Sequence, residues 1–91
     1  MNLITQLDEE AFRRRYRGPQ CEGSLTYAKR TANEYAEQHA GGMPEWVRLG
    51  VAALHFRYCY TLDTGDRQLI RIGIDTLLAV GGACHAQHSS L

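Results

Sequence analysis

One segment constrains the fold of this chain more than any other. Over residues 46–62 the apolar side chains would cover nearly the whole circumference of a helix, whereas a surface helix carries them in one stripe. Such a helix has to be surrounded, and a chain of 91 residues supplies only about two or three further helices and one core. We therefore expect this segment to be the central helix of a small bundle, or to leave part of its surface for another subunit.

The first half of the chain predicts two helices. The first covers 6–17, where Thr5 and Asp8 approximate a capping box and a glycine–proline pair ends the helix. The second follows Ser24, which is a suitable N-cap, and ends at the C-cap pair Gly41-Gly42.

The second half predicts two more helices and a tail. The central helix runs over 44–62, with Pro44 at its first position. After a polar turn, Asp66 caps a fourth helix over 67–80, which a pair of glycines ends. Residues 83–91 are expected to be a flexible tail. The chain is thus expected to be one domain over 1–91, an all-α four-helix bundle with a central hydrophobic third helix.

Apolar spacing predicts which face of each outer helix is buried. The expected core positions are Leu7, Ala11, Phe12 and Tyr16 in the first helix, Leu25, Ala28, Ala32, Tyr35, Ala36 and His39 in the second, and Leu69, Ile70, Gly73, Ile74, Leu77 and Val80 in the fourth. The alanines of the second helix would allow a neighbouring helix to approach closely. The segment 70–74 also alternates like a strand, but no second strand candidate could pair with it.

Charge gives no global clue to a partner. Ten basic and ten acidic residues leave a formal net charge of zero, so no overall field attracts nucleic acid or an anionic membrane. Four arginines form one local patch, Arg13, Arg14, Arg15 and Arg17. Around Tyr16 they could bind an anion or an acidic partner, or hold a phosphate and stack on a base. Acidic residues at 8–10 partly neutralise the patch, so a solvated helix end or an interface with an acidic partner is favoured over a nucleic-acid or phosphate site.

No catalytic or cofactor motif is present. Cys59 and His55 are one helical turn apart, but a thiol in so apolar a helix has a raised pKa and is unreactive. The tail holds Cys84 and His88, which could complete a metal site only together with the first pair, and no metal or cofactor is expected. We expect a protein that is not an enzyme.

The cysteines and the hydropathy also bear on location. Three cysteines without paired spacing, and no signal peptide, indicate the cytoplasm of a cell. The longest apolar stretch is interrupted by Arg48, His55 and Arg57, so no membrane span is expected.

The central helix carries more aromatic surface than one core needs. Four residues are expected to form a partner interface, with core packing a competing explanation for the first two: Trp46, Phe56, Tyr58 and Tyr60. An oligomer or another protein subunit is the expected partner.

Three segments resemble a known family. Residues 42–58, GMPEWVRLGVAALHFRY, resemble the Val-Pro-Glu-x-Ile-x-x-Ala-x-Leu-x-Leu-x-x-x-x-Tyr helix of small head-to-tail connector (head-completion) proteins of tailed bacteriophages. Residues 72–78, IGIDTLL, are similar to the family's Phe-Gly-Val-x-x-Leu-Leu segment, and 31–37, TANEYAE, to its second helix. The chain lacks the insertion that the family often carries between these helices, and the arginine run is not a family feature.

The resemblance implies a helical subunit that assembles into a ring between portal and tail, in the host cytoplasm or the virion. The expected function is therefore a non-catalytic protein-binding or assembly subunit. Two alternatives remain open at this point. One is a small phage or plasmid inhibitor that docks on a host complex, and the other is a binder of nucleotide or nucleic acid through the arginine patch.

Overall fold

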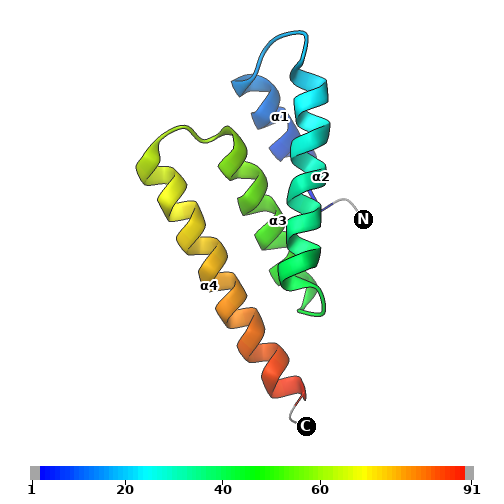
Figure 1. Cartoon of the computed structure of the whole chain (residues 1–91), viewed down its shortest axis with the longest axis vertical. Helices are drawn as coiled ribbons and strands as arrows, with labels where there is room; N and C mark the ends of the chain where they lie inside the picture. Colours follow the sequence, from blue (N-terminus) through cyan, green and yellow to red (C-terminus); the bar gives the residue numbers. More distant parts are fainter. Residues whose placement is uncertain (1–2, 90–91) are drawn as a thin grey trace.

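The computed structural model describes the backbone of residues 3–89 and the side chains of residues 3–83. Over this part of the chain the backbone forms four α-helices and no strand, which confirms the predicted all-α four-helix bundle (Figure 1). The helices are α1 (Gln6–Arg15), α2 (Cys21–Ala40), α3 (Glu45–Tyr60) and α4 (Thr64–Ser89).

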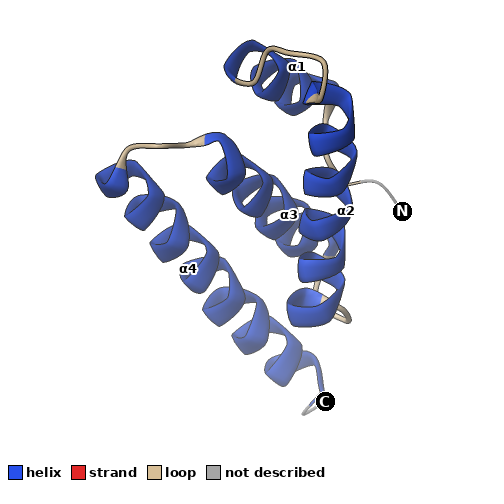
Figure 2. Cartoon of the chain, turned by 45° about the horizontal axis from the view of Figure 1, so that its top comes forward, coloured by secondary structure: helices blue, strands red, loops and turns tan. Residues whose placement is uncertain are grey.

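The apolar third helix lies at the centre of the bundle. It contacts each of the other three helices, with α1 and α2 on one side and α4 on the other (Figure 2). Its fully buried side chains are Val47, Val51, Ala52 and Phe56. A helix that is apolar all round is thus enclosed mainly by its own chain.

Alanines form the face of α2 that packs on α3. The buried positions recur at every fourth residue, Ala28, Ala32, Ala36 and Ala40, below the buried Leu25. Small side chains at this spacing let the two helices approach closely, as the sequence predicted. Tyr35 is only half-buried and His39 is exposed, so the buried face is narrower than expected.

Glycines bring α3 and α4 together. A Cβ atom at Gly50 would lie 2.7 Å from Cδ1 of Leu77, and one at Gly73 would lie 3.2 Å from Cδ1 of Leu54. A Cβ atom at Gly81 would lie 2.7 Å from Sδ of Met43. At each of these glycines, a large side chain of the neighbouring segment therefore occupies the space that a Cβ atom would fill.

The predicted boundaries of the first two helices are partly confirmed. Thr5 caps α1, since its Oγ1 accepts a hydrogen bond of 3.2 Å from the Asp8 N–H. The second helix ends at Ala40 with Gly41 as C-cap, as predicted. Its predicted start is wrong: α2 begins at Cys21 rather than after Ser24, and the residue before it makes no side-chain capping bond.

The predicted boundaries of α4 are wrong at both ends. The helix begins at Thr64, and Asp63 caps it in place of Asp66 by accepting a 2.9 Å hydrogen bond from the Asp66 N–H. It also continues through Gly81 to Ser89. Packing against α3 offsets the helix-breaking tendency of the first glycine. The predicted flexible tail is helical in backbone as far as residue 89, and the side chains of Cys84 and His88 lie outside the described residues.

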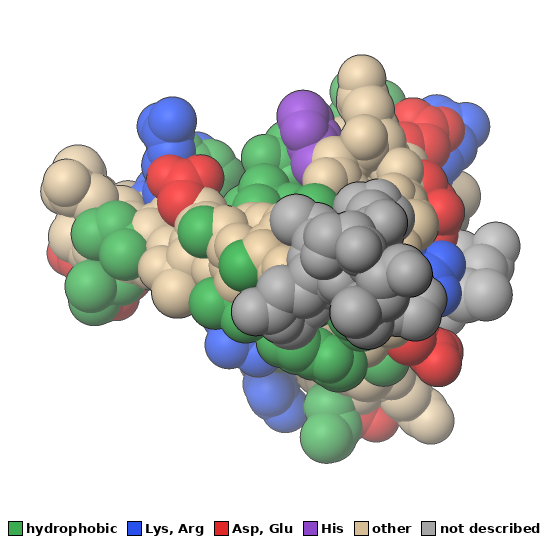
Figure 3. Space-filling view, turned by 90° about the horizontal axis from the view of Figure 1, so that it is seen from below, with side chains coloured by type: hydrophobic (Ala, Val, Ile, Leu, Met, Phe, Trp, Pro, Cys, Tyr) green, Lys and Arg blue, Asp and Glu red, His purple; other side chains and the backbone are tan. Residues whose placement is uncertain are grey.

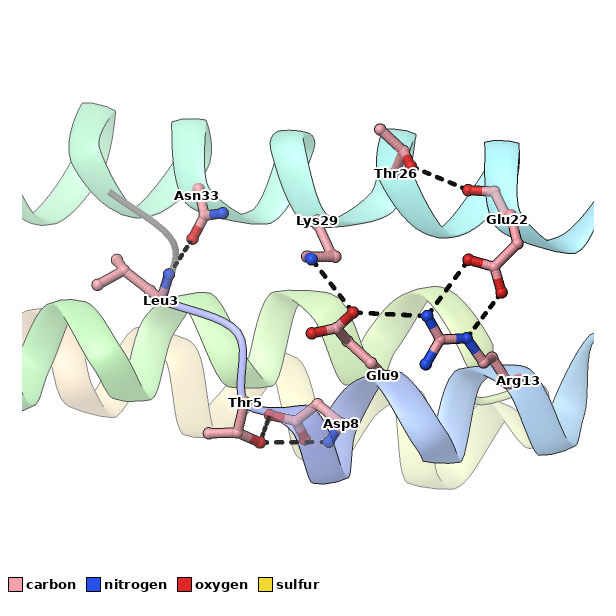
Figure 4. A network of polar contacts seen from close by, with 9 residues as sticks. All are labelled: Leu3, Thr5, Asp8, Glu9, Arg13, Glu22, Thr26, Lys29 and Asn33. Atoms are coloured by element: carbon pink, nitrogen blue, oxygen red, sulfur yellow. Dashed lines mark hydrogen bonds and ion pairs between the residues drawn. The ribbon is translucent and has the colours of Figure 1, made fainter.

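A polar network fixes α1 to α2 (Figure 4). Oε1 of Glu9 lies 3.2 Å from Nζ of Lys29 and 3.8 Å from the Arg13 guanidinium. Arg13 also makes two hydrogen bonds to Glu22, and the Leu3 N–H donates to Asn33 at 2.8 Å. These contacts place Arg13, the first residue of the arginine run, against α2.

Candidate functional site

The residues of the predicted aromatic interface lie in different environments in the structure. Phe56 is fully buried and packs on the ring of Phe12 at 5.6 Å between centroids. Its prediction as a partner contact is wrong, because the ring is enclosed by its own chain. Tyr60 is half-buried and meets the rings of Phe12 and Phe56 edge-on, so it borders the same core. Tyr58 is half-buried beneath Arg67, whose guanidinium carbon lies 4.1 Å from the ring centroid.

Trp46 differs from this group because it is 52% exposed. Core packing, which was one expected explanation of this residue, does not account for it. Four more large apolar side chains on α3 and α4 are exposed by 40% or more. We define the α3–α4 apolar face as Trp46, Leu49, Leu69, Ile72 and Val80.

These five residues lie on one side of the helix pair. The contact between Tyr58 and Arg67 marks the other side. Counting about 100° of turn per residue, Leu49 lies on the side of α3 away from Tyr58, and Leu69 lies on the side of α4 away from Arg67. The remaining three residues follow within about one quarter turn of these two. By this count the five residues share one side of the α3–α4 pair.

The sequence pattern assigned part of this face to the core. Leu69 and Val80 were expected to be buried, and they are 67% and 44% exposed. Ile70 and Ile74, which were also expected in the core, are buried, and Gly81 is buried although it was not among the expected core positions. The apolar positions of α4 lie around more than half of the helix circumference, so periodicity alone does not show which of them meet α3.

The arginines of the run also differ in their surroundings. Arg13 lies between Glu9 and Glu22. Its guanidinium donates hydrogen bonds to the Glu22 carboxylate, and these bonds raise the pKa of Arg13 and lower the pKa of Glu22. Arg14 is exposed and makes no ion pair among the described residues. Arg15 and Arg17 line a groove that the sequence did not reveal. The patch is thus not one site.

This groove has a volume of about 890 Å³ and lies where the α1–α2 link, α2, α3 and the start of α4 meet. We call it the basic groove. Its walls combine aromatic rings, small side chains and guanidinium groups: Phe12, Arg15, Tyr16, Arg17, Gly18, Pro19, Gln20, Cys21, Ser24, Tyr27, Ala28, Thr31, His55, Tyr58, Cys59 and Arg67. In Figure 1 the α1–α2 link and the start of α4 both lie in the upper half of the molecule.

The lining of the basic groove is positively charged. It includes Arg15, Arg17 and Arg67, and no carboxylate is among its lining residues. None of the three arginines forms an ion pair within the part of the chain whose side chains are described. The groove also borders the start of α2, where the helix dipole adds positive potential.

Two buried polar atoms in the groove lining have no hydrogen-bond partner. They are Nδ1 of His55 and Nε of Arg67. Burial lowers the pKa of His55, and the nearby His39 lowers it further, so His55 is held in its neutral form. One face of its ring stacks on Tyr35, with centroids 4.5 Å apart.

Cysteine chemistry has little support at this site. Burial raises the pKa of Cys59, while Arg67 opposes that shift only in part. Its Sγ lies 3.5 Å from the carbonyl oxygen of His55, to which the thiol donates, rather than against a base. No cluster of three or more metal-ligating side chains occurs among the described residues. The composite metal site depends on Cys84 and His88, which lie outside them.

Within the described residues, no helix is both long enough and apolar enough to cross a bilayer. Comparison with known protein families, with curated proteins and with solved structures gave no match. The two surfaces of this molecule, the α3–α4 apolar face and the basic groove, therefore have to be interpreted from their own chemistry.

Proposed function

We propose that this protein is a non-catalytic assembly subunit that associates with further copies of itself through the α3–α4 apolar face. The observation that carries the proposal is the exposure of five large apolar side chains on one side of two adjacent helices. Large apolar side chains that are exposed on one side of a protein are typical of protein interaction sites.

The spacing of the face on α4 suits helix-to-helix contact. Leu69, Ile72, Thr76 and Val80 follow at intervals of three and four residues, the spacing at which residues of a helix form a seam for another helix. The aromatic Trp46 lies on the adjacent α3, and aromatic anchors often dominate the binding energy of an interface.

Charge supports a second copy as the occupant. The formal net charge is zero and the isoelectric point is close to 6.9, so copies do not repel one another near neutral pH. Acidic and basic side chains are interspersed at the end of the molecule where α4 finishes, and hydrophobic ones reach the surface between them (Figure 3). A ring-forming connector, as the resemblance implies, is the particular form of assembly that we propose.

Light scattering coupled to gel filtration tests the proposal. The wild type is expected to have a mass well above that of the 10.2 kDa monomer. The variant Leu69→Ser/Ile72→Ser is expected to be a monomer with unchanged helical circular dichroism, because exposed residues add little to the monomer core. Tyr27→Ser is the matched control, since Tyr27 is 63% exposed but lines the basic groove on the other side.

A closed ring in the wild type would support the connector. A dimer would support self-association through this face but not the ring. A wild type that is monomeric at all concentrations would contradict the proposal and favour an inhibitor that docks on a host complex. Equal dissociation of the Tyr27→Ser control would show that the apolar face is not the interface.

A further inference from the structure

We propose that the basic groove binds a small anion with a planar ring, of the chemical class of a nucleoside monophosphate. This proposal is independent of assembly through the α3–α4 apolar face. The volume of about 890 Å³ falls within the range of small-molecule sites, and the lining follows their usual pattern of apolar walls with a few polar groups.

One end of the groove is suited to a phosphate. Arg15 and Arg17 both contribute to the lining at the α1–α2 link, and neither is neutralised by an ion pair among the described residues. Guanidinium groups bind phosphate through two parallel hydrogen bonds. The start of α2 lies at the same end and adds the positive end of its dipole.

The aromatic part of the lining is suited to a planar ring. Tyr27 is exposed on α2 and Tyr58 is half-buried on α3, and both rings line the groove. Arg67 covers the ring of Tyr58 at 4.1 Å, which leaves a flat guanidinium beside the cavity. Aromatic rings and guanidinium planes are the surfaces on which nucleic-acid bases stack.

Two residues that line the groove also hold polar atoms that no described group of the chain partners. Nδ1 of His55 and Nε of Arg67 are buried without a hydrogen-bond partner. Buried polar groups are nearly always paired, so an orphan of this kind calls for an explanation.

A small molecule fits the charge distribution better than a nucleic-acid strand does. A strand requires a basic surface that follows several phosphates, whereas the protein as a whole is neutral. Arg13, which belongs to the same arginine run but does not line the groove, is already paired with Glu22 and Glu9. The free guanidinium groups of the lining are thus confined to one concavity.

Isothermal titration calorimetry at low salt tests the proposal with adenosine monophosphate and uridine monophosphate as probes. We expect saturable binding by the wild type of at least one probe. Arg17→Gln should raise the dissociation constant by about tenfold, because a charge-assisted hydrogen bond is lost. Arg14→Gln should not change it, since Arg14 belongs to the same run but does not line the groove. Both arginines are exposed, so both variants should fold.

Two ligand controls separate the proposal from its rivals. Adenosine and uridine without phosphate, and inorganic phosphate alone, should each bind more weakly than the corresponding monophosphate. The proposal is overturned if neither monophosphate binds, if inorganic phosphate binds as well as the monophosphates, or if Arg14→Gln and Arg17→Gln weaken binding equally. It is also overturned if a short single-stranded oligonucleotide binds far more tightly than either monophosphate with a steep salt dependence, because that result would indicate a strand-binding surface.

Discussion

At the scale of single residues, the environment of His55 changes the chemistry that its type suggests. A histidine one turn from a cysteine is a potential base or metal ligand when only the sequence is considered. In the fold it stacks on Tyr35, and its Nδ1 atom is buried without a partner. Burial therefore favours the neutral ring and makes the folded state resist protonation.

This resistance predicts a loss of stability in mild acid. The unfolded chain takes up the proton at the ordinary pKa of 6.5, whereas the pKa of folded His55 is lower. Above that pH, His55 is neutral in both states and does not destabilise the fold. As the pH falls below it, the unfolded chain binds a proton that folded His55 resists, so the free energy of unfolding declines. Chemical denaturation between about pH 7.5 and about pH 5.5 should show this decline in the wild type. His55→Gln should show a smaller one, and an identical pH dependence would contradict the role of this residue.

At the scale of elements, α4 depends on α3 for part of its length. A pair of glycines is a common helix end, yet the helix continues through Gly81 and Gly82. Gly81 is buried at the site where Met43 and Val47 approach, whereas a Cβ atom at Gly82 would have no neighbour within 4 Å. Adjacent residues of the same type thus have different roles.

These two glycines provide a matched pair of variants. Gly81→Ala should lower the free energy of unfolding by about 1–3 kcal/mol, because the new Cβ atom would overpack the contact with Met43 and Val47. Gly82→Ala should raise it by up to about 1 kcal/mol, since alanine is the better helix former. Urea denaturation of both variants gives the comparison. If both stabilise the protein, the close approach of α3 and α4 at Gly81 is wrong.

The difference between Gly81 and Gly82 also shows which parts of the fold could be predicted. Local signals were sufficient for the number of helices, the Thr5 cap and the alanine face of α2. The end of α4 could not be predicted, because it depends on Met43 and Val47, distant in sequence. The same limit applies to the sites. The spacing of Phe56 and Trp46 does not reveal which ring α1 covers, and the basic groove joins residues from all four helices.

At the scale of the whole molecule, two surfaces of different chemistry lie on opposite sides of the α3–α4 pair. The basic groove collects unpaired guanidinium groups, and the α3–α4 apolar face collects leucine, isoleucine, valine and tryptophan side chains. A substitution in one of these surfaces therefore does not change the side chains that form the other. If both proposals hold, self-association and anion binding are separable by mutation.

Assembly should also be visible in the thermal stability of the protein. If copies associate through the α3–α4 apolar face, unfolding is coupled to dissociation, and the thermal midpoint rises with protein concentration. The wild type should show a rise of a few degrees over the concentrations accessible to calorimetry, and Leu69→Ser/Ile72→Ser should show none. The Tyr27→Ser control should behave like the wild type. A midpoint that is independent of concentration in all three proteins would mean that the exposed apolar face does not join copies of this chain.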